Sequence, residues 1–193
     1  NGTDSIFKCI DILKKARNRG FSLPVVLMGY LNSFKPGWID ASRNLISGVI
    51  VVDLPVEEKH THIFVNECEK NNISFIPIIT SATVDERVKK INLIASTYIY
   101  LVSVLGITGT RNFVDNYFIK YKTVYDKIKK NVDYKCLVGF GISNNETVKA
   151  VKNTGASGLV VGTAIMKKII ELIDDSNFED KFITFLRNFF TTK

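Results

Sequence analysis

Cysteine is scarce in this chain of 193 residues. The three cysteines, Cys9, Cys68 and Cys136, are far apart in the sequence, and no two of them form a C-x-x-C pair. This spacing argues against a cysteine-based zinc site and against a dense disulfide framework. An odd, scattered set with apolar neighbours predicts reduced, buried thiols in a reducing compartment.

Histidine is rarer still, with two residues in the chain. His60 and His62 lie next to Glu57 and Glu58, which invites interpretation as a metal site. Positions two apart on a helix do not face each other, and zinc-binding helices space their histidines four apart. An exposed helix surface is the better interpretation, so we expect no metal.

Long apolar runs are absent as well. No stretch approaches the ~18 residues that a bilayer-spanning helix requires. Residues 1–4 are polar and lack the charged and apolar regions of a signal peptide. We therefore expect no membrane segment.

Charge is present in both signs, with a formal net charge of +7. The basic residues recur at helical spacing in several separate segments, which is typical of the solvated outer face of a helix layer. No aromatic–basic motif accompanies them, so we expect no nucleic-acid partner. The excess of positive charge would still help to gather an anionic substrate.

Two kinds of sequence segment alternate along the chain. Short apolar, β-branched runs are separated by longer segments with an apolar residue at every third or fourth position, a pattern that indicates βαβ units and a parallel sheet. The hydrophobic content of 46% allows residues 1–193 to form a single domain with one core. The expected strands are 23–30, 48–53, 74–80, 97–103, 135–141 and 158–162. The expected helices are 4–19, a short one ending near 46, 55–68, 83–95, 114–131, 164–173 and 178–189.

The number of these units bears on the fold class. About six strand–helix units are fewer than the eight of a closed (β/α)₈ barrel, which usually needs about 250 residues. We therefore predict an α/β fold of the TIM-barrel class, a (β/α)₈ barrel truncated to about six β/α units. Two helix starts, Thr83-Val-Asp-Glu86 and Ser143-Asn-Asn-Glu146, have the spacing of a capping box.

Two glycine-rich loops follow the last two expected strands, where a parallel barrel places its active site. Gly139-Phe-Gly-Ile-Ser143 leads to a capped helix, and Val160-Val-Gly-Thr-Ala-Ile165 enters a helix at once. Free backbone N–H groups and the positive end of a helix dipole attract phosphate, so we predict a phosphate site here. The alternative is that both loops are ordinary tight turns that need glycine for their geometry.

A third loop, Gly106-Ile-Thr-Gly109, is also flanked by glycine. Its glycines can act as hinges and Thr108 offers a hydroxyl, which makes the loop a candidate lid over a substrate. A plain flexible loop explains the same spacing equally well.

These strand ends, in this order, resemble those of the tryptophan synthase α subunit. The closest motifs are Tyr-Ile-Tyr-Leu-Val-Ser-Val-Leu-Gly-Ile-Thr-Gly at 98–109, Val-Gly-Phe-Gly-Ile-Ser at 138–143 and Val-Val-Gly-Thr-Ala-Ile at 160–165. The resemblance implies a lyase that cleaves indole-3-glycerol phosphate to indole and glyceraldehyde 3-phosphate by a retro-aldol reaction in tryptophan biosynthesis. It also implies a tryptophan synthase β subunit as partner in an α2β2 complex, no cofactor, and a location in the cytoplasm or the plastid stroma.

The resemblance assigns the phosphate grip to four residues of the last two loops, although the family usually has serine where Thr163 stands. These residues are Phe140, Gly141, Gly162 and Thr163.

Other positions match the rest of the substrate pocket and the subunit interface. Thr108 and Gly109 match the closing lid, and Tyr100 matches a tyrosine that lines the pocket. Four apolar residues match positions around the indole ring, and three others match the surface that meets the β subunit. The first group is Met28, Ile50, Val52 and Ile78, and the second is Tyr30, Asn32 and Pro55.

The departures from the family concern catalysis. Its two catalytic carboxylates, a Glu and an Asp near a Pro-Phe-Ser-Asp-Pro motif, have no match here, and the first residues of this chain align just beyond that motif. The chain thus resembles the C-terminal two-thirds of the family, without the first two strands. We expect no catalytic residue in 1–193 and little or no lyase activity from these residues alone, and we do not assign Asp53, the one carboxylate at a strand end, as a base.

Two alternative functions follow from these departures. A non-catalytic protein that binds a phosphate ligand or a β subunit, and only regulates, would explain the missing carboxylates, although the retained lid argues against it. Another phosphate-binding barrel enzyme, such as an epimerase or a sugar-phosphate isomerase, is disfavoured by the missing metal ligands and by the Gly-Ile-Thr-Gly motif.

Overall fold

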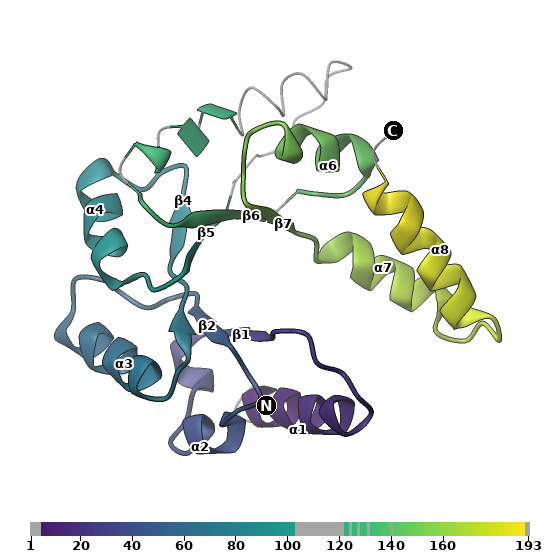
Figure 1. Ribbon diagram of the computed structural model, residues 1–193, viewed down its shortest axis with the longest axis horizontal. Helices are drawn as coiled ribbons and strands as arrows, with labels where there is room; N and C mark the ends of the chain where they lie inside the picture. The colour runs from purple at the N-terminus through teal and green to yellow at the C-terminus, as the bar shows by residue number, and fades with distance from the viewer. Residues whose placement is uncertain are drawn as a thin grey trace. The chain divides into compact units, whose positions relative to one another are not determined.

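A computed structural model describes residues 5–102, 122–139 except 124, 127 and 131, and 141–191 (Figure 1). The chain divides into two compact units. The first comprises the residues up to Ile78 together with Val84–Ile99, and the second comprises Ile79–Thr83 together with the residues from Tyr100 onward. Within the described residues, no helix is long and apolar enough to cross a membrane.

The first unit carries a three-stranded sheet in the order β1-β2-β3. Both strand pairs are parallel, with Val26 opposite Gly48 and Gly48 opposite Ser74. Every residue of β2 is buried, as its unbroken apolar run predicts for a parallel strand covered on both faces. The elements here are α1 (Ser5–Asn18), β1 (Val26–Gly29), η2 (Leu31–Ser33), α2 (Trp38–Ser42), β2 (Gly48–Val51), α3 (Lys59–Lys70), β3 (Ser74–Phe75) and α4 (Asp85–Ile94).

The helices of this unit bury one apolar stripe each. In α1, Ile6, Ile10 and Leu13 are buried at the spacing of three and four residues that brings side chains to one helix face. In α4, Val88 and Ile91 are almost fully buried in the same way. These buried stripes are part of the core of the first unit.

The second sheet has four strands in the order β4-β5-β6-β7. β6 and β7 are parallel neighbours, and their last paired residues are Gly139 and Val160. Val148 and Val151 of α6 are fully buried. The elements are β4 (Ile78–Thr80), β5 (Tyr98–Val102), β6 (Lys135–Gly139), α6 (Asn145–Lys152), β7 (Gly158–Val160), α7 (Thr163–Leu172) and α8 (Phe178–Phe190).

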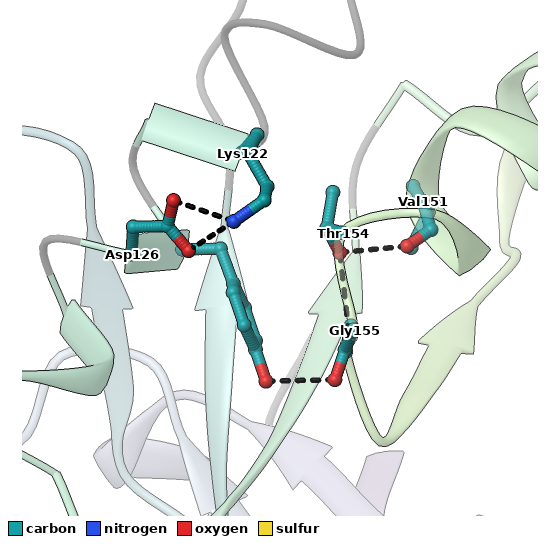
Figure 2. A network of polar contacts seen from close by, with 7 residues as sticks. Lys122, Asp126, Val151, Thr154 and Gly155 are labelled. Carbon is teal, nitrogen blue, oxygen red and sulfur yellow. Dashed lines mark hydrogen bonds and ion pairs between the residues drawn. The ribbon is translucent and has the colours of Figure 1, made fainter.

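The turn between α6 and β7 is fixed by hydrogen bonds to side chains (Figure 2). The described residues between 122 and 129 are helical, and the Tyr125 hydroxyl donates a hydrogen bond to the Gly155 carbonyl at 2.8 Å. In the same turn, the Thr154 hydroxyl donates to the Val151 carbonyl at 2.7 Å. These contacts hold the turn that leads to the start of β7.

The expected strand 74–80 is interrupted. Its first half, β3, pairs with β2, whereas its second half, β4, belongs to the four-stranded sheet. Pro77 lies between them and has no backbone N–H to donate to a strand ladder, so a continuous strand is broken there. The other five expected strands are confirmed with shorter bounds.

The helix starts differ from the expected ones in three places. α3 begins at Lys59, four residues after Pro55. The expected capping box at Thr83 is wrong, because Val84 is the N-cap of α4 and the Thr83 hydroxyl instead accepts a hydrogen bond from the Thr80 N–H at 3.0 Å. The expected box at 143–146 is displaced by one residue, to Asn144 and Thr147.

One further expectation fails in α1. Cys68 and Cys136 are buried as expected, but Cys9 is exposed. It lies on the solvent side of α1, away from the buried stripe. The apolar neighbours of Cys9 in the sequence belong to that stripe, which is why they suggested burial for the thiol as well.

Candidate functional site

The two glycine-rich turns lie at the same edge of the second sheet. Gly139 and Val160 are opposite each other at the ends of β6 and β7. Gly141 and Gly162 each follow two residues later in the sequence. Because neighbouring parallel strands end at the same edge, the register brings these two turns side by side, as the phosphate prediction requires.

The turn after β6 is largely satisfied by its own side chains. Gly141 has φ of +77°, a left-handed conformation that favours glycine. Asn144 Oδ1 accepts from the Thr147 N–H at 2.9 Å, and Thr147 Oγ1 accepts from the N–H groups of Ser143 and Asn144 at 3.0 and 3.1 Å. The expectation of free amides at this helix start is therefore wrong for Ser143, Asn144 and Thr147.

The turn after β7 is different. Gly162, the N-cap of α7, has no side chain, and no side chain among the described residues caps this helix start. The first turn of α7 contains no acidic residue, and both Gly162 and Thr163 are exposed. A Cβ built on Gly162 meets nothing within 4 Å. An open helix start without a cap leaves its N–H groups and dipole available to an anion.

Tyr100 of β5 lies directly against β6. A Cβ built on Gly139 would overlap the Tyr100 hydroxyl and its ring edge, so glycine at 139 makes room for this phenol. Tyr100 is buried, and burial raises the pKa of its hydroxyl above the usual value. The phenol thus stays protonated at neutral pH and can donate a hydrogen bond. Thr108, Gly109 and Phe140 lie outside the described residues.

Two of the expected indole-pocket residues share one face of the first sheet. Met28 is paired with Ile50, so their side chains point to the same side, and Val52 lies in the turn directly after β2. Met28 and Val52 are 51% and 39% exposed and Ile50 is 8% exposed. The apolar face is thus open to a ligand at its carboxyl end. Ile78 is half-buried at the start of β4, in the other sheet.

A hydrogen bond links the two segments that carry the expected partner surface. The Leu31 N–H donates to Asp53 Oδ1 at 2.7 Å, which links the segment after β1 to the segment after β2. Tyr30 and Asn32 are exposed on either side of Leu31, and Pro55 follows Asp53. Asp53, which the sequence presented as a lone carboxylate at a strand end, therefore has a structural partner.

Sequence reasoning missed the roles of Asp53 and Thr147. The Asn-x-x-Thr spacing of 144–147 was a usable signal, because Asn is a preferred N-cap and the side chain at N3 closes the box. No signal of comparable strength marked Asp53, whose partner is 22 residues away in the sequence.

The histidines behave as the exposed-surface interpretation requires. His60 and His62 are both exposed on α3. In the described part of the chain, no group of three or more His, Cys, Asp or Glu side chains is placed to hold a metal ion.

Comparison with known proteins extends this picture. The family model described as tryptophan synthase alpha chain matches residues 1–190. The chain is 34% identical over 174 residues to a tryptophan synthase alpha chain of Methanocaldococcus jannaschii, and 35% identical over 179 residues to one of Clostridium beijerinckii. These matches cover 88% and 89% of this chain but 60% and 65% of the relatives, so the chain spans less than two-thirds of their length.

The fold is also similar to that of solved structures. A structure of the tryptophan synthase α2β2 complex from Pyrococcus furiosus matches with a TM-score of 0.79 and 30% identity, covering 93% of this chain and 71% of that chain. A mutant α subunit from the same organism matches with a TM-score of 0.78. The predicted α/β fold class of tryptophan synthase α subunits is confirmed, and the chain belongs to the tryptophan synthase alpha chain family.

Proposed function

We propose that this chain provides the phosphate-binding and indole-binding parts of a tryptophan synthase α subunit, and acts in the cleavage of indole-3-glycerol phosphate to indole and glyceraldehyde 3-phosphate. The observation that carries the proposal is the pairing of two turns at one sheet edge, one of which is the uncapped start of α7. Membership of the family supports the substrate and the reaction class.

The phosphate would be held mainly by the start of α7. The N–H groups of its first turn and the Thr163 hydroxyl would donate to the phosphate oxygens, with Gly141 contributing from the neighbouring turn. Thr163 keeps the hydroxyl of the serine usual in the family. Binding of this remote group supplies energy that orients the rest of the substrate.

The resemblance assigns contacts with the indole ring to Met28, Ile50, Val52 and Ile78. It assigns Tyr100, a neutral phenol, to the lining of the substrate pocket. In the reaction, the bond between indole C3 and the glycerol carbon breaks, C3 gains a proton, and the hydroxyl on that carbon becomes the aldehyde. Asp53 is bonded to Leu31 and is not assigned to these proton transfers.

Three further expectations accompany the proposal. The segment around Tyr30, Asn32 and Pro55 would meet a β subunit; the similar Pyrococcus furiosus structure is that of an α2β2 complex. The protein would work in the cytoplasm or the plastid stroma. Residues 1–193 alone would show little or no lyase activity, and turnover of indole-3-glycerol phosphate at a normal family rate would contradict this.

The direct test is calorimetric titration with sn-glycerol 3-phosphate. The unaltered chain should bind, and Gly162→Asp should weaken binding about tenfold or more, equivalent to ~1.4 kcal/mol. The φ of −110° at Gly162 is outside the left-handed region that favours glycine, so the change adds a carboxylate without that strain. A carboxylate beside a helix N-terminus interacts favourably with the helix dipole, so the fold should keep its stability.

Leu93→Asp is the matched control, because it adds the same charge at a side chain that is 83% exposed on α4. It should leave the affinity for glycerol phosphate unchanged. Equal binding by the unaltered chain and by Gly162→Asp would show that α7 does not hold the phosphate, and the proposal would fail.

A further inference from the structure

Thr147 makes an unusual number of contacts for one small side chain. It lies in the first turn of α6 and is 6% exposed. Its Oγ1 accepts hydrogen bonds from the Ser143 and Asn144 N–H groups and donates to the Asn144 carbonyl at 2.8 Å. One hydroxyl thus satisfies the two peptide groups that directly precede the helix.

These two peptides adjoin the left-handed turn at Gly141. Ile142 lies between Gly141 and Ser143. Its side chain is 4% exposed and packed into the core, whereas Gly141 is exposed. The short segment is therefore held at two points, by the Ile142 side chain and by the Thr147 hydroxyl. Glycine is the most freely rotating residue, so the direction of its N–H depends on how firmly the following residues are held.

We propose that Thr147 is a positioning residue for the phosphate turn. Its hydroxyl occupies the Ser143 and Asn144 amides before any ligand arrives, and so fixes the peptide of Gly141 in the direction that the phosphate uses. The inference rests on the proposed phosphate site and adds a residue that does not touch the ligand. A turn organised in advance loses less conformational freedom on binding.

The same helix offers a matched control. Thr154, just beyond the other end of α6, is 4% exposed, donates to the Val151 carbonyl and accepts from the Ala156 N–H at 3.2 Å. It resembles Thr147 in burial and in its bonds to backbone, but it lies beside the start of β7, away from the two glycine turns. Valine at either position removes a hydroxyl and keeps the shape of the side chain.

The test compares Thr147→Val, Thr147→Ser and Thr154→Val by titration with sn-glycerol 3-phosphate and by thermal unfolding. Both valine variants should lose thermal stability. Only Thr147→Val should bind about tenfold more weakly, while Thr147→Ser, which restores the hydroxyl, should bind nearly as the unaltered chain does. Unchanged affinity in a folded Thr147→Val, or an equal loss in Thr154→Val, would overturn the inference.

If Thr147→Val does not fold, amide hydrogen exchange of the unaltered chain provides a second test of the inference. The Ser143 and Asn144 amides should be protected without ligand and should change little when glycerol phosphate is added. Rapid exchange at both amides in the absence of ligand would overturn it. If the unaltered chain binds no phosphate at all, the proposed function fails and this inference fails with it; if it binds and Thr147→Val binds equally, only this inference fails.

Discussion

Gly139 and Tyr100 occupy a space that holds only one side chain. A methyl group at 139 would overlap the phenol oxygen and the adjoining ring carbons. We expect Gly139→Ala to destabilise the fold by about 1–3 kcal/mol, the usual cost of overpacking a filled core, and to displace Tyr100 from the pocket. Urea unfolding and titration with an indole-bearing ligand would measure the two effects.

The double variant Gly139→Ala/Tyr100→Phe is the control for this prediction. Removal of the hydroxyl relieves the nearest overlap but leaves the ring carbons, so stability should recover only in part. If Gly139→Ala alone is as stable as the unaltered chain, β5 and β6 can move apart at little cost and glycine is not required at 139.

The three thiols should differ sharply in reactivity. Burial raises the pKa of Cys68 to about 12 and that of Cys136 to about 11, so both remain thiols at pH 8, and the thiolate is the reactive form. Cys9 is exposed. A colorimetric thiol reagent at pH 8 should modify one cysteine in the native chain and all three after denaturation in guanidinium.

Cys9→Ser identifies the reacting residue, since the rapid phase should vanish in that variant. Rapid modification of a second thiol in the native chain would mean that the core around Cys68 or Cys136 opens readily.

At the scale of elements, the Asn145 amide links the start of α6 to the end of α8. Asn145 Nδ2 lies 3.0 Å from the Asn188 carbonyl and 2.6 Å from the Thr191 carbonyl, at the end of α8. We expect Asn145→Ala to cost about 1–2 kcal/mol, because it leaves helix-end carbonyls without their donor. Urea unfolding would give the loss, and faster tryptic cleavage at Lys181 and Arg187 would show that α8 has loosened.

Asn145→Asp separates the donor from the size of the side chain. Aspartate keeps the shape and suits a helix start, but it cannot donate to a carbonyl. The same loosening of α8 in both variants would support the amide as the cause, whereas a fully protected α8 in Asn145→Asp would argue against it.

The elements themselves were largely predictable from sequence. The apolar run of β2 and the stripe of α1 were clear because one pattern of burial runs through each. The apolar neighbours of Pro77 predict one continuous strand over 74–80. Apolar character does not indicate that β3 and β4 join different sheets. The cap of α6 was misplaced by one residue because Ser143 and Asn144 are both good N-caps, and only the geometry of the turn chooses between them.

At the scale of the whole molecule, contacts between segments far apart in sequence decide the candidate surfaces. The bond from Leu31 to Asp53 is an example, and it supports the expected β-subunit surface. We expect Asp53→Leu to weaken binding of a tryptophan synthase β subunit about tenfold, because the segment carrying Tyr30 and Asn32 is released. Sedimentation or calorimetric titration with a purified β subunit would measure it.

Asp53→Asn is the matched control, because its amide oxygen can still accept from the Leu31 N–H. It should bind the β subunit nearly as well as the unaltered chain. Equal binding by Asp53→Leu would show that this segment is not part of the contact surface.

The candidate site was predictable only in outline. Glycine between a strand end and a helix start suggested Gly141 and Gly162 as phosphate ligands, although ordinary tight turns need glycine as well. The difference between the two turns was not predictable, because it depends on whether a nearby side chain folds back onto the amides. Asn144 and Thr147 do so at α6, while none of the side chains that the structure describes does so at α7.

The bare start of α7 has a consequence for anyone who engineers this protein. A Cβ at 162 meets nothing within 4 Å, and an acidic side chain there would stabilise the helix through its dipole. Libraries screened for heat tolerance alone should therefore favour acidic residues at 162, which would block the proposed phosphate site. A selection that rewards retention of a phosphate ester alongside survival at high temperature should instead leave this glycine untouched.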